Sequence, residues 1–147
     1  MRGGSFHNLV VDQAKAALDG VFEQVESEYL IRRNGVATFV DLYGDGESGH
    51  LAVEVETTER HAIDNARKAA AVDVPLWIVV PTQALQRRLA RQVGLLDLRP
   101  GGEPICVLLL GQLAQRLTSY LSPRIQKAIN NKQIKSNPEI GLGPGRP

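Results

Sequence analysis

Residues 51–56 of the chain have the sequence Leu51-Ala52-Val53-Glu54-Val55-Glu56. This apolar segment predicts a β-strand from His50 to Thr57. In a strand, residues two positions apart point to the same face of the sheet. Glu54 and Glu56 are therefore predicted to share one face, while Val53 and Val55 enter the other. The segment thus predicts a strand with one apolar and one acidic face.

A third carboxylate is predicted to lie opposite this strand. Residues 38–43 form the preceding predicted strand, and the glycine-rich residues 44–49 form a turn by composition. A hairpin centred between residues 47 and 48 places Asp41 opposite Glu54, with Cβ atoms about 5 Å apart. Like charges this close are destabilising. The carboxylates are therefore expected either to hold a hard cation such as Mg²⁺ or Mn²⁺, or to face solvent on an open sheet.

The order of the other predicted elements indicates an α/β fold. Asn34-Gly35 predicts a tight hairpin turn. Short turns make the first three strands antiparallel, whereas strands separated by helices are predicted to be parallel. The predicted helices span residues 5–25, 58–72, 83–93 and 112–121, and the predicted strands span residues 27–33, 38–43, 50–57, 76–80 and 105–110. The order αβββαβαβα predicts a mixed sheet with helices on both faces.

The first predicted helix carries apolar residues at spacings of three and four, which is typical of an amphipathic helix. Ser5 is predicted to cap this helix, and Thr82 is predicted to cap the third. His7, a single histidine near the start of the chain, is predicted to lie at the surface. The apolar residues of the first helix are Phe6, Leu9, Val10, Ala14, Ala17, Leu18, Val21, Phe22 and Val25.

The sequence around Asp41 and Glu54 resembles the motif of the PD-(D/E)XK nuclease superfamily, which has the restriction endonuclease-like fold. Val40-Asp41, a glycine-rich hairpin and Glu54-Val55-Glu56 follow one another as the family motif does. The element order of residues 5–80 also matches the family core. The resemblance implies that Asp41 and Glu54 ligate Mg²⁺ (or Mn²⁺) during hydrolysis of DNA phosphodiester bonds. It further implies that the Val55 carbonyl is an additional metal ligand.

The chain departs from the family motif at two positions. Val40 replaces a proline that is not a ligand, and Glu56 replaces the motif lysine. Family variants carry glutamate there, or carry the lysine on the following helix, where Lys68 is the candidate. The alternative for Lys68 is a solvated lysine on a helix surface. The resemblance therefore implies a catalytic set of Asp41, Glu54, Glu56 and Lys68.

Charge is divided unequally along the chain, although the formal net charge is only +1. Residues 1–64 hold 12 of the 16 acidic and five of the 17 basic residues, and the remainder of the chain is correspondingly basic. A basic surface can neutralise DNA phosphates without sequence specificity. The alternative for the C-terminal basic residues is a solubilising or dimer-swapping tail. The residues predicted to contact the DNA backbone are Arg87, Arg88, Arg91, Lys127 and Lys132.

The length of 147 residues predicts a single domain at residues 1–134, followed by a disordered Pro/Gly-rich basic tail at residues 135–147. One cysteine, Cys106, excludes an internal disulfide framework and a Cys-rich zinc site. No apolar run approaches the roughly 20 residues of a membrane helix, and no signal peptide is recognisable. These features predict a cytoplasmic protein that does not enter a membrane.

Two functional hypotheses follow from the sequence. The first is a metal-dependent DNA endonuclease, or nuclease-like domain, and small nucleases of the family often dimerise, so a homodimer is expected. The second is a catalytically inactive nucleic-acid-binding or assembly domain of the same fold, because the in-line lysine is missing. A third class, small-molecule α/β enzymes, has no positive support, since no G-x-G-x-x-G follows a strand.

Overall fold

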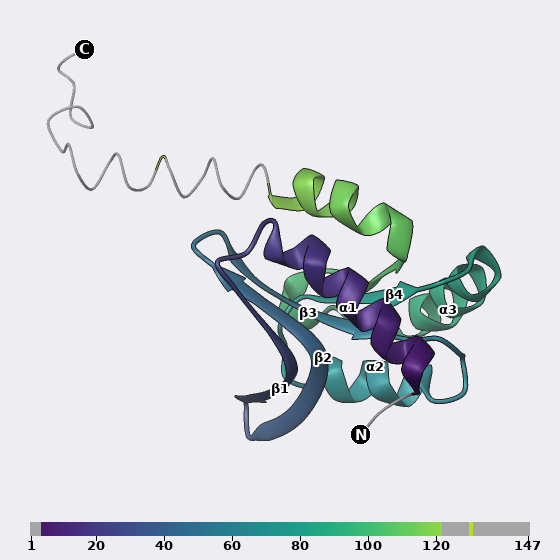
Figure 1. The fold of residues 1–147 in the computed structure, drawn as a ribbon. Coiled ribbons are helices and arrows are strands. Elements are labelled where there is room, and N and C mark those ends of the chain that lie inside the picture. Colours follow the sequence, from purple (N-terminus) through teal and green to yellow (C-terminus); the bar gives the residue numbers. More distant parts are fainter. Residues whose placement is uncertain (1–3, 122–129, 131–147) are drawn as a thin grey trace, which may run out of the picture.

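A computed structural model describes residues 4–121 and residue 130, and it has an α/β fold built on one five-stranded mixed sheet (Figure 1). The strands lie side by side in the order β1-β2-β3-β4-β5. Residues 113–121 form a further helix. The labelled helices and strands are α1 (Ser5–Asp19), β1 (Gln24–Arg33), β2 (Val36–Gly46), β3 (Gly49–Val55), α2 (Ala62–Ala70), β4 (Leu76–Val80), α3 (Gln83–Leu96) and β5 (Cys106–Leu109). The predicted element order is confirmed.

The strand directions follow from the lengths of the connections. β1, β2 and β3 form an antiparallel meander, whereas β3, β4 and β5 run parallel. Asn34 and Gly35 both adopt left-handed backbone conformations, with φ of 54° and 75°, and Arg33 pairs with Val36 across them. This is the two-residue turn that asparagine followed by glycine favours. Helical crossovers bring the later strands back in the same direction.

Helices cover both faces of the sheet. Along the inner strands, successive side chains point alternately toward the helices on one face and those on the other. Val53 and Val55 pack with Trp77 in a core formed by α1 and residues 113–121. Ala52 belongs to a core against α2, and Ile78 to a core against α2 and α3. Figure 1 shows α1 and α2 on opposite sides of the sheet. All five residues of β4 are buried, as a continuous apolar run predicts.

The first helix is shorter than predicted. α1 ends at Asp19, and Phe22 turns inward so that its ring packs against Gly44 of β2. The apolar residues beyond Asp19 continue the helical spacing although the backbone has already left the helix, so the predicted end at residue 25 was wrong. Gly4 occupies the N-cap position, which corrects the predicted cap at Ser5. Phe6 and Leu9, counted among the apolar residues of this helix, are exposed.

The other boundaries differ by a few residues. β2 is longer than predicted at both ends, α2 begins at Ala62 instead of residue 58, and α3 continues to Leu96. The predicted N-cap of α3 is confirmed, because the Thr82 hydroxyl accepts a hydrogen bond from the Leu85 amide at 3.3 Å. Within the described residues, no helix combines the length and apolar character needed to cross a bilayer. The predicted tail at residues 135–147 lies outside the described residues.

Candidate functional site

Asp41 lies where the pairing of β2 with β3 ends and where its pairing with β1 is interrupted for one residue. The β2–β3 ladder runs from Gly46 to Leu42 and ends there. The β1–β2 ladder pairs the residues before and after Asp41 but omits Asp41 itself. The register places Glu28 across from it, with a φ of 47° that an extended strand does not allow. The backbone of Asp41 therefore has no ladder partner in either neighbouring strand, although β2 itself continues through this position.

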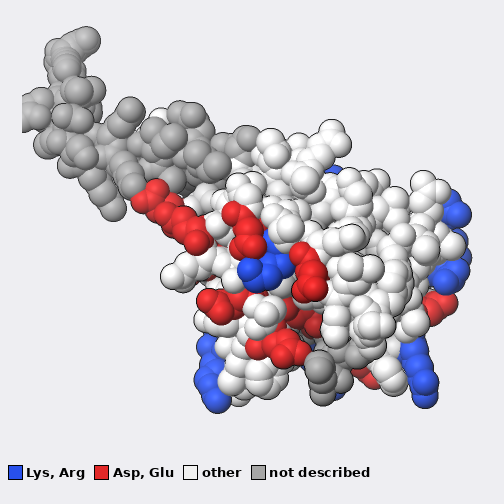
Figure 2. All heavy atoms as spheres, in the orientation of Figure 1, with Lys and Arg blue, Asp and Glu red and all other residues white. Residues whose placement is uncertain are grey.

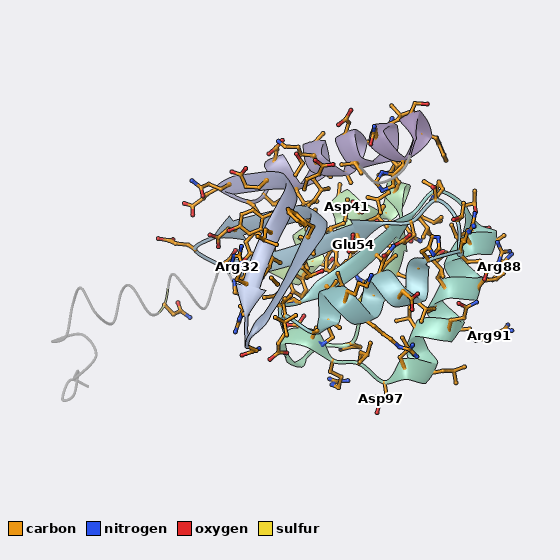
Figure 3. All side chains as sticks on the ribbon, turned by 90° about the horizontal axis from the view of Figure 1, so that it is seen from below. Arg32, Asp41, Glu54, Arg88, Arg91 and Asp97 are labelled. Atoms are coloured by element: carbon orange, nitrogen blue, oxygen red, sulfur yellow. The ribbon has the colours of Figure 1, made fainter. Side chains whose placement is uncertain are left out.

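The predicted hairpin register is confirmed, because Leu42 pairs with Val53 and the next position brings Asp41 opposite Glu54. Side chains replace the ladder at this level. The Asp41 amide donates to Glu54 Oε1 at 3.4 Å, and the Val55 amide donates to Asp41 Oδ2 at 2.7 Å. Each carboxylate thus satisfies a backbone donor of the opposite strand. The two hydrogen bonds hold Asp41 and Glu54 side by side (Figure 3).

All three predicted carboxylates are buried. The exposed fractions of Asp41, Glu54 and Glu56 are 5%, 2% and 6%. A buried carboxylate is costly unless hydrogen bonds, an opposite charge or a bound cation compensates it. The α2 residue Asn65 provides part of this compensation by donating from Nδ2 to Glu56 Oε2 at 3.0 Å. The alternative in which the carboxylates face solvent on an open sheet is therefore wrong.

His7 was predicted at the surface, but it is 7% exposed and lies against the same group of residues. Its Nε2 is 3.1 Å from the Val55 carbonyl oxygen and 3.5 Å from Asp41 Oδ2. Its Nδ1 is also buried and has no hydrogen-bond partner within the described residues. The prediction failed because it considered His7 alone. His7 precedes Val10, Ala14 and Leu18 at spacings of three and four, and this is the buried stripe of α1.

A cavity of about 500 Å³ opens beside Glu56, where the chain leaves β3. Lys68 follows Asn65 by three residues on α2, so the two side chains share one side of the helix and both line this cavity. The structure therefore places Lys68 and Glu56 around one space. The lining residues are His7, Glu56, Thr57, Thr58, His61, Asn65 and Lys68. A second cavity, of about 420 Å³, contains none of the predicted site residues.

The predicted DNA-contacting arginines of α3 differ in their surroundings. Arg87, Arg88 and Arg91 are all exposed. Arg88 donates from Nε to Glu59 Oε1 at 2.7 Å, and Gln92 donates to the other oxygen of the same carboxylate at 2.8 Å. Arg88 therefore ties α3 to the loop that follows β3, on the side of the molecule where Figure 3 labels it. Lys127 and Lys132 lie outside the described residues.

Charge on the molecular surface is also unevenly distributed. Figure 2 shows acidic side chains gathered over the centre of one face around a basic side chain, with other basic side chains along its margins. The exposed acids include Asp19 of α1, which pairs with Lys15 at 3.0 Å. The carboxylates of the candidate site are distinct from these exposed acids, because all three are buried.

The donor set at Asp41 suits a hard cation. Two carboxylates and a backbone carbonyl are ligands that Mg²⁺ and Mn²⁺ accept. Two of these groups, the Asp41 carboxylate and the Val55 carbonyl, already converge on one point, His7 Nε2. Among residues 4–121 and 130, no group of three or more His, Cys, Asp and Glu side chains is arranged to hold a metal. A metal ion at this position would need the Val55 carbonyl as a ligand in addition to the side chains.

Comparisons of the chain with protein-family models, with curated proteins and with solved structures gave no match.

Proposed function

We propose that the protein is a metal-dependent nuclease of the PD-(D/E)XK type, which hydrolyses phosphodiester bonds in DNA. The observation that carries the proposal is the pair of buried carboxylates, Asp41 and Glu54, which accept hydrogen bonds from backbone amides of β3 and β2 where the β2–β3 ladder ends. The αβββαβαβα order and the mixed sheet agree with it. So does Lys68, which lines the adjoining cavity together with Glu56.

Asp41, Glu54 and the Val55 carbonyl would hold Mg²⁺ or Mn²⁺. When bound, such an ion lowers the pKa of a bound water and neutralises charge that builds on the phosphate. The chain's own residues perform the remaining tasks. Burial lowers the local dielectric around Asp41 and Glu54, which strengthens their attraction for a cation. The hydrogen bond from Asn65 fixes the orientation of the Glu56 carboxylate beside the cavity.

The cavity supplies groups that suit a phosphate. Lys68 contributes an ammonium, which can attract an anionic phosphate oxygen, and Thr57 and Thr58 contribute hydroxyl donors. Glu56, in the wall of the same cavity, is an acceptor that can orient an attacking water or take its proton. In this proposal Lys68, which lies on α2, takes the role of the lysine that the family motif places directly after β3.

DNA would approach across the basic surfaces of the chain. Arg87 and Arg91 are four residues apart on α3 and exposed, so they present two cations on one side of the helix. Such contacts bind the phosphate backbone without sequence preference. We also expect a homodimer, since two sites would be needed to cut both strands, and light scattering of the purified chain measures this directly.

The test is a cleavage assay with the full chain, Mg²⁺ or Mn²⁺, and double-stranded, flap and single-stranded DNA. Glu54→Gln is expected to abolish cleavage without lowering the unfolding temperature, because glutamine keeps the shape and the acceptor oxygen. Glu26→Gln removes an exposed carboxylate of β1 and is the matched control, which should cut at the wild-type rate. Intact DNA under all these conditions would contradict the nuclease.

The second candidate is a nucleic-acid-binding or assembly domain of the same fold without catalysis. The hydrogen bonds that already engage Asp41 and the Val55 carbonyl favour it, since both groups are compensated by the chain itself. Binding of DNA in EDTA, with the same affinity in Glu54→Gln and without cleavage in any metal, would support this candidate over the nuclease.

A further inference from the structure

We propose that His7 occupies the cation's place in the metal-free protein and must swing away from Asp41 and Val55 before a divalent ion binds. The proposal rests on the function proposed above, because it concerns the same site. None of the motif residues lies on α1. In this proposal, a residue of α1 nevertheless lowers the affinity of the site on β2 and β3 for a metal ion.

The first argument is the position of the ring. Nε2 of His7 is 3.1 Å from the Val55 carbonyl oxygen and 3.5 Å from Asp41 Oδ2. These atoms belong to two of the three groups that would ligate the ion. A carbonyl oxygen accepts hydrogen bonds and cannot donate them, so Nε2 must carry a proton. A partly positive N–H therefore lies between two oxygens that a cation would otherwise join.

The second argument is what holds the ring there. Nδ1 is buried and has no hydrogen-bond partner within the described residues, so only the Nε2 side of the ring is anchored by polar contacts. An unsatisfied buried nitrogen is unfavourable, so leaving this position relieves a cost as well as breaking a contact. Metal-ligating histidines, in contrast, usually have their second nitrogen hydrogen-bonded.

The third argument is that a cavity next to the His7 ring can accommodate it in a second position. His7 lines the cavity of about 500 Å³ that Glu56 and Lys68 also line. A rotation of the side chain toward this space would free both oxygens without unwinding α1. His7 is in the first turn of that helix, two residues after its start at Ser5, where a side chain meets few preceding helical residues.

The consequence is competition. In the wild type, an ion must replace the hydrogen bond from His7 to the Val55 carbonyl and its contact with Asp41, whereas in His7→Ala the two oxygens are not contacted by this ring. We expect His7→Ala to bind Mn²⁺ on the order of tenfold more tightly, which corresponds to the upper end of what one hydrogen bond contributes. His7→Gln keeps a donor on a flexible side chain and should remain close to the wild type.

Two measurements on the full chain test this proposal. Calorimetric titration with Mn²⁺ compares the wild type, His7→Ala, His7→Gln and Asn8→Ala, the last being an exposed neighbour on α1 that should bind like the wild type. NMR of the histidine rings follows the Nε2–H of His7, identified by its absence from His7→Gln. This signal should be present without metal and be lost or strongly shifted at saturating Mg²⁺. Thermal unfolding confirms that each variant is folded.

The possible results distinguish a failure of this inference from a failure of the proposed nuclease function. Tighter binding by His7→Ala, together with the loss or shift of the ring signal, supports it. Equal or weaker binding by His7→Ala, or a ring signal unchanged at saturation, overturns it while leaving the metal site intact. Weaker binding would identify His7 as a ligand instead. No binding by any variant overturns both the inference and the metal-dependent nuclease.

Discussion

The carboxylate of Asp41 accepts a hydrogen bond from a backbone amide of β3, and the carboxylate of Glu54 accepts one from a backbone amide of β2. These two bonds replace the backbone pairing that the β2–β3 ladder lacks at this level. This arrangement satisfies two backbone donors but brings two buried acids together. Like charges opposite one another in a sheet oppose folding. A cost of this kind agrees with the proposed cation site, because functional residues often oppose stability.

At the residue scale, Glu54→Gln is therefore expected to stabilise the metal-free protein by up to about 1 kcal/mol. Glutamine keeps an oxygen that can accept from the Asp41 amide, while it removes one charge. Urea unfolding in EDTA measures the change. Repeating it with Mg²⁺ should reverse the order, since the ion stabilises the wild type in proportion to its binding. A lower stability of the variant in EDTA would contradict this account.

Asp41→Ala is expected to behave in the opposite way. The substitution removes the carboxylate oxygen that accepts the 2.7 Å hydrogen bond from the Val55 amide. The buried Val55 N–H then loses this acceptor. The expected loss of unfolding free energy is about 1–3 kcal/mol. Asp41→Asn, which retains an acceptor oxygen, is the comparison and should lose less. Equal losses in the two variants would show that the hydrogen bond does not account for the effect.

At the scale of elements, the position of the site depends on how β2 packs against the segment after α1. A Cβ atom added at Gly44 would lie 2.5 Å from the ring of Phe22, so this glycine is what allows the close approach. The approach fixes where α1 lies, and α1 carries His7 to Asp41 and Val55. The spacing of apolar residues predicted that α1 is longer than it is, because a pattern along the chain contains no information about the contact between Phe22 and Gly44.

Gly44→Ala is expected to destabilise the protein by about 1–3 kcal/mol, because the side chain overlaps a buried ring. Gly94→Ala is the matched control, since Gly94 lies within α3 and a Cβ there meets no atom within 4 Å apart from its own stretch of the helix. Alanine in a helix should stabilise it by roughly 0.5–1 kcal/mol. Denaturant unfolding compares the two, and a stabilising Gly44→Ala would refute the packing argument.

At the scale of the whole molecule, the proposed DNA surface and the acidic face occupy different regions. Acidic side chains gather over the centre of the face in Figure 2, while Arg87 and Arg91 are exposed on α3. This separation would let the proposed DNA contacts form away from the exposed acidic side chains. Arg88 serves a different purpose, since its contact with Glu59 ties α3 to the loop beside the cavity.

Replacing both Arg87 and Arg91 by alanine is expected to weaken DNA binding and to reduce the slope of log affinity against log salt by about 2, because each arginine neutralises one phosphate. Fluorescence anisotropy at several salt concentrations measures both quantities. Lys15→Ala, on α1, removes a positive charge that pairs with Asp19 and should leave the slope unchanged. An unchanged slope in the double variant would place the DNA elsewhere.

Much of the fold follows from local patterns along the chain. Alternation along residues 51–56 determined which side chains share a face of β3, and the glycine-rich turn determined the register that brings Asp41 opposite Glu54. Asn34-Gly35 similarly determined a two-residue turn. These features are predictable because they depend on backbone geometry over a few residues and on a period of two.

The tertiary structure alone decided which of these residues meet and how deeply they are buried. His7 and Val55 are 48 positions apart, and their contact exists because α1 folds back across the sheet. The carboxylates are buried because α1 covers one face and α2 the other, which no spacing within β3 can express. Lys68 reaches the cavity of Glu56 for the same reason: burial and proximity arise from packing between elements, whereas periodicity describes each element by itself.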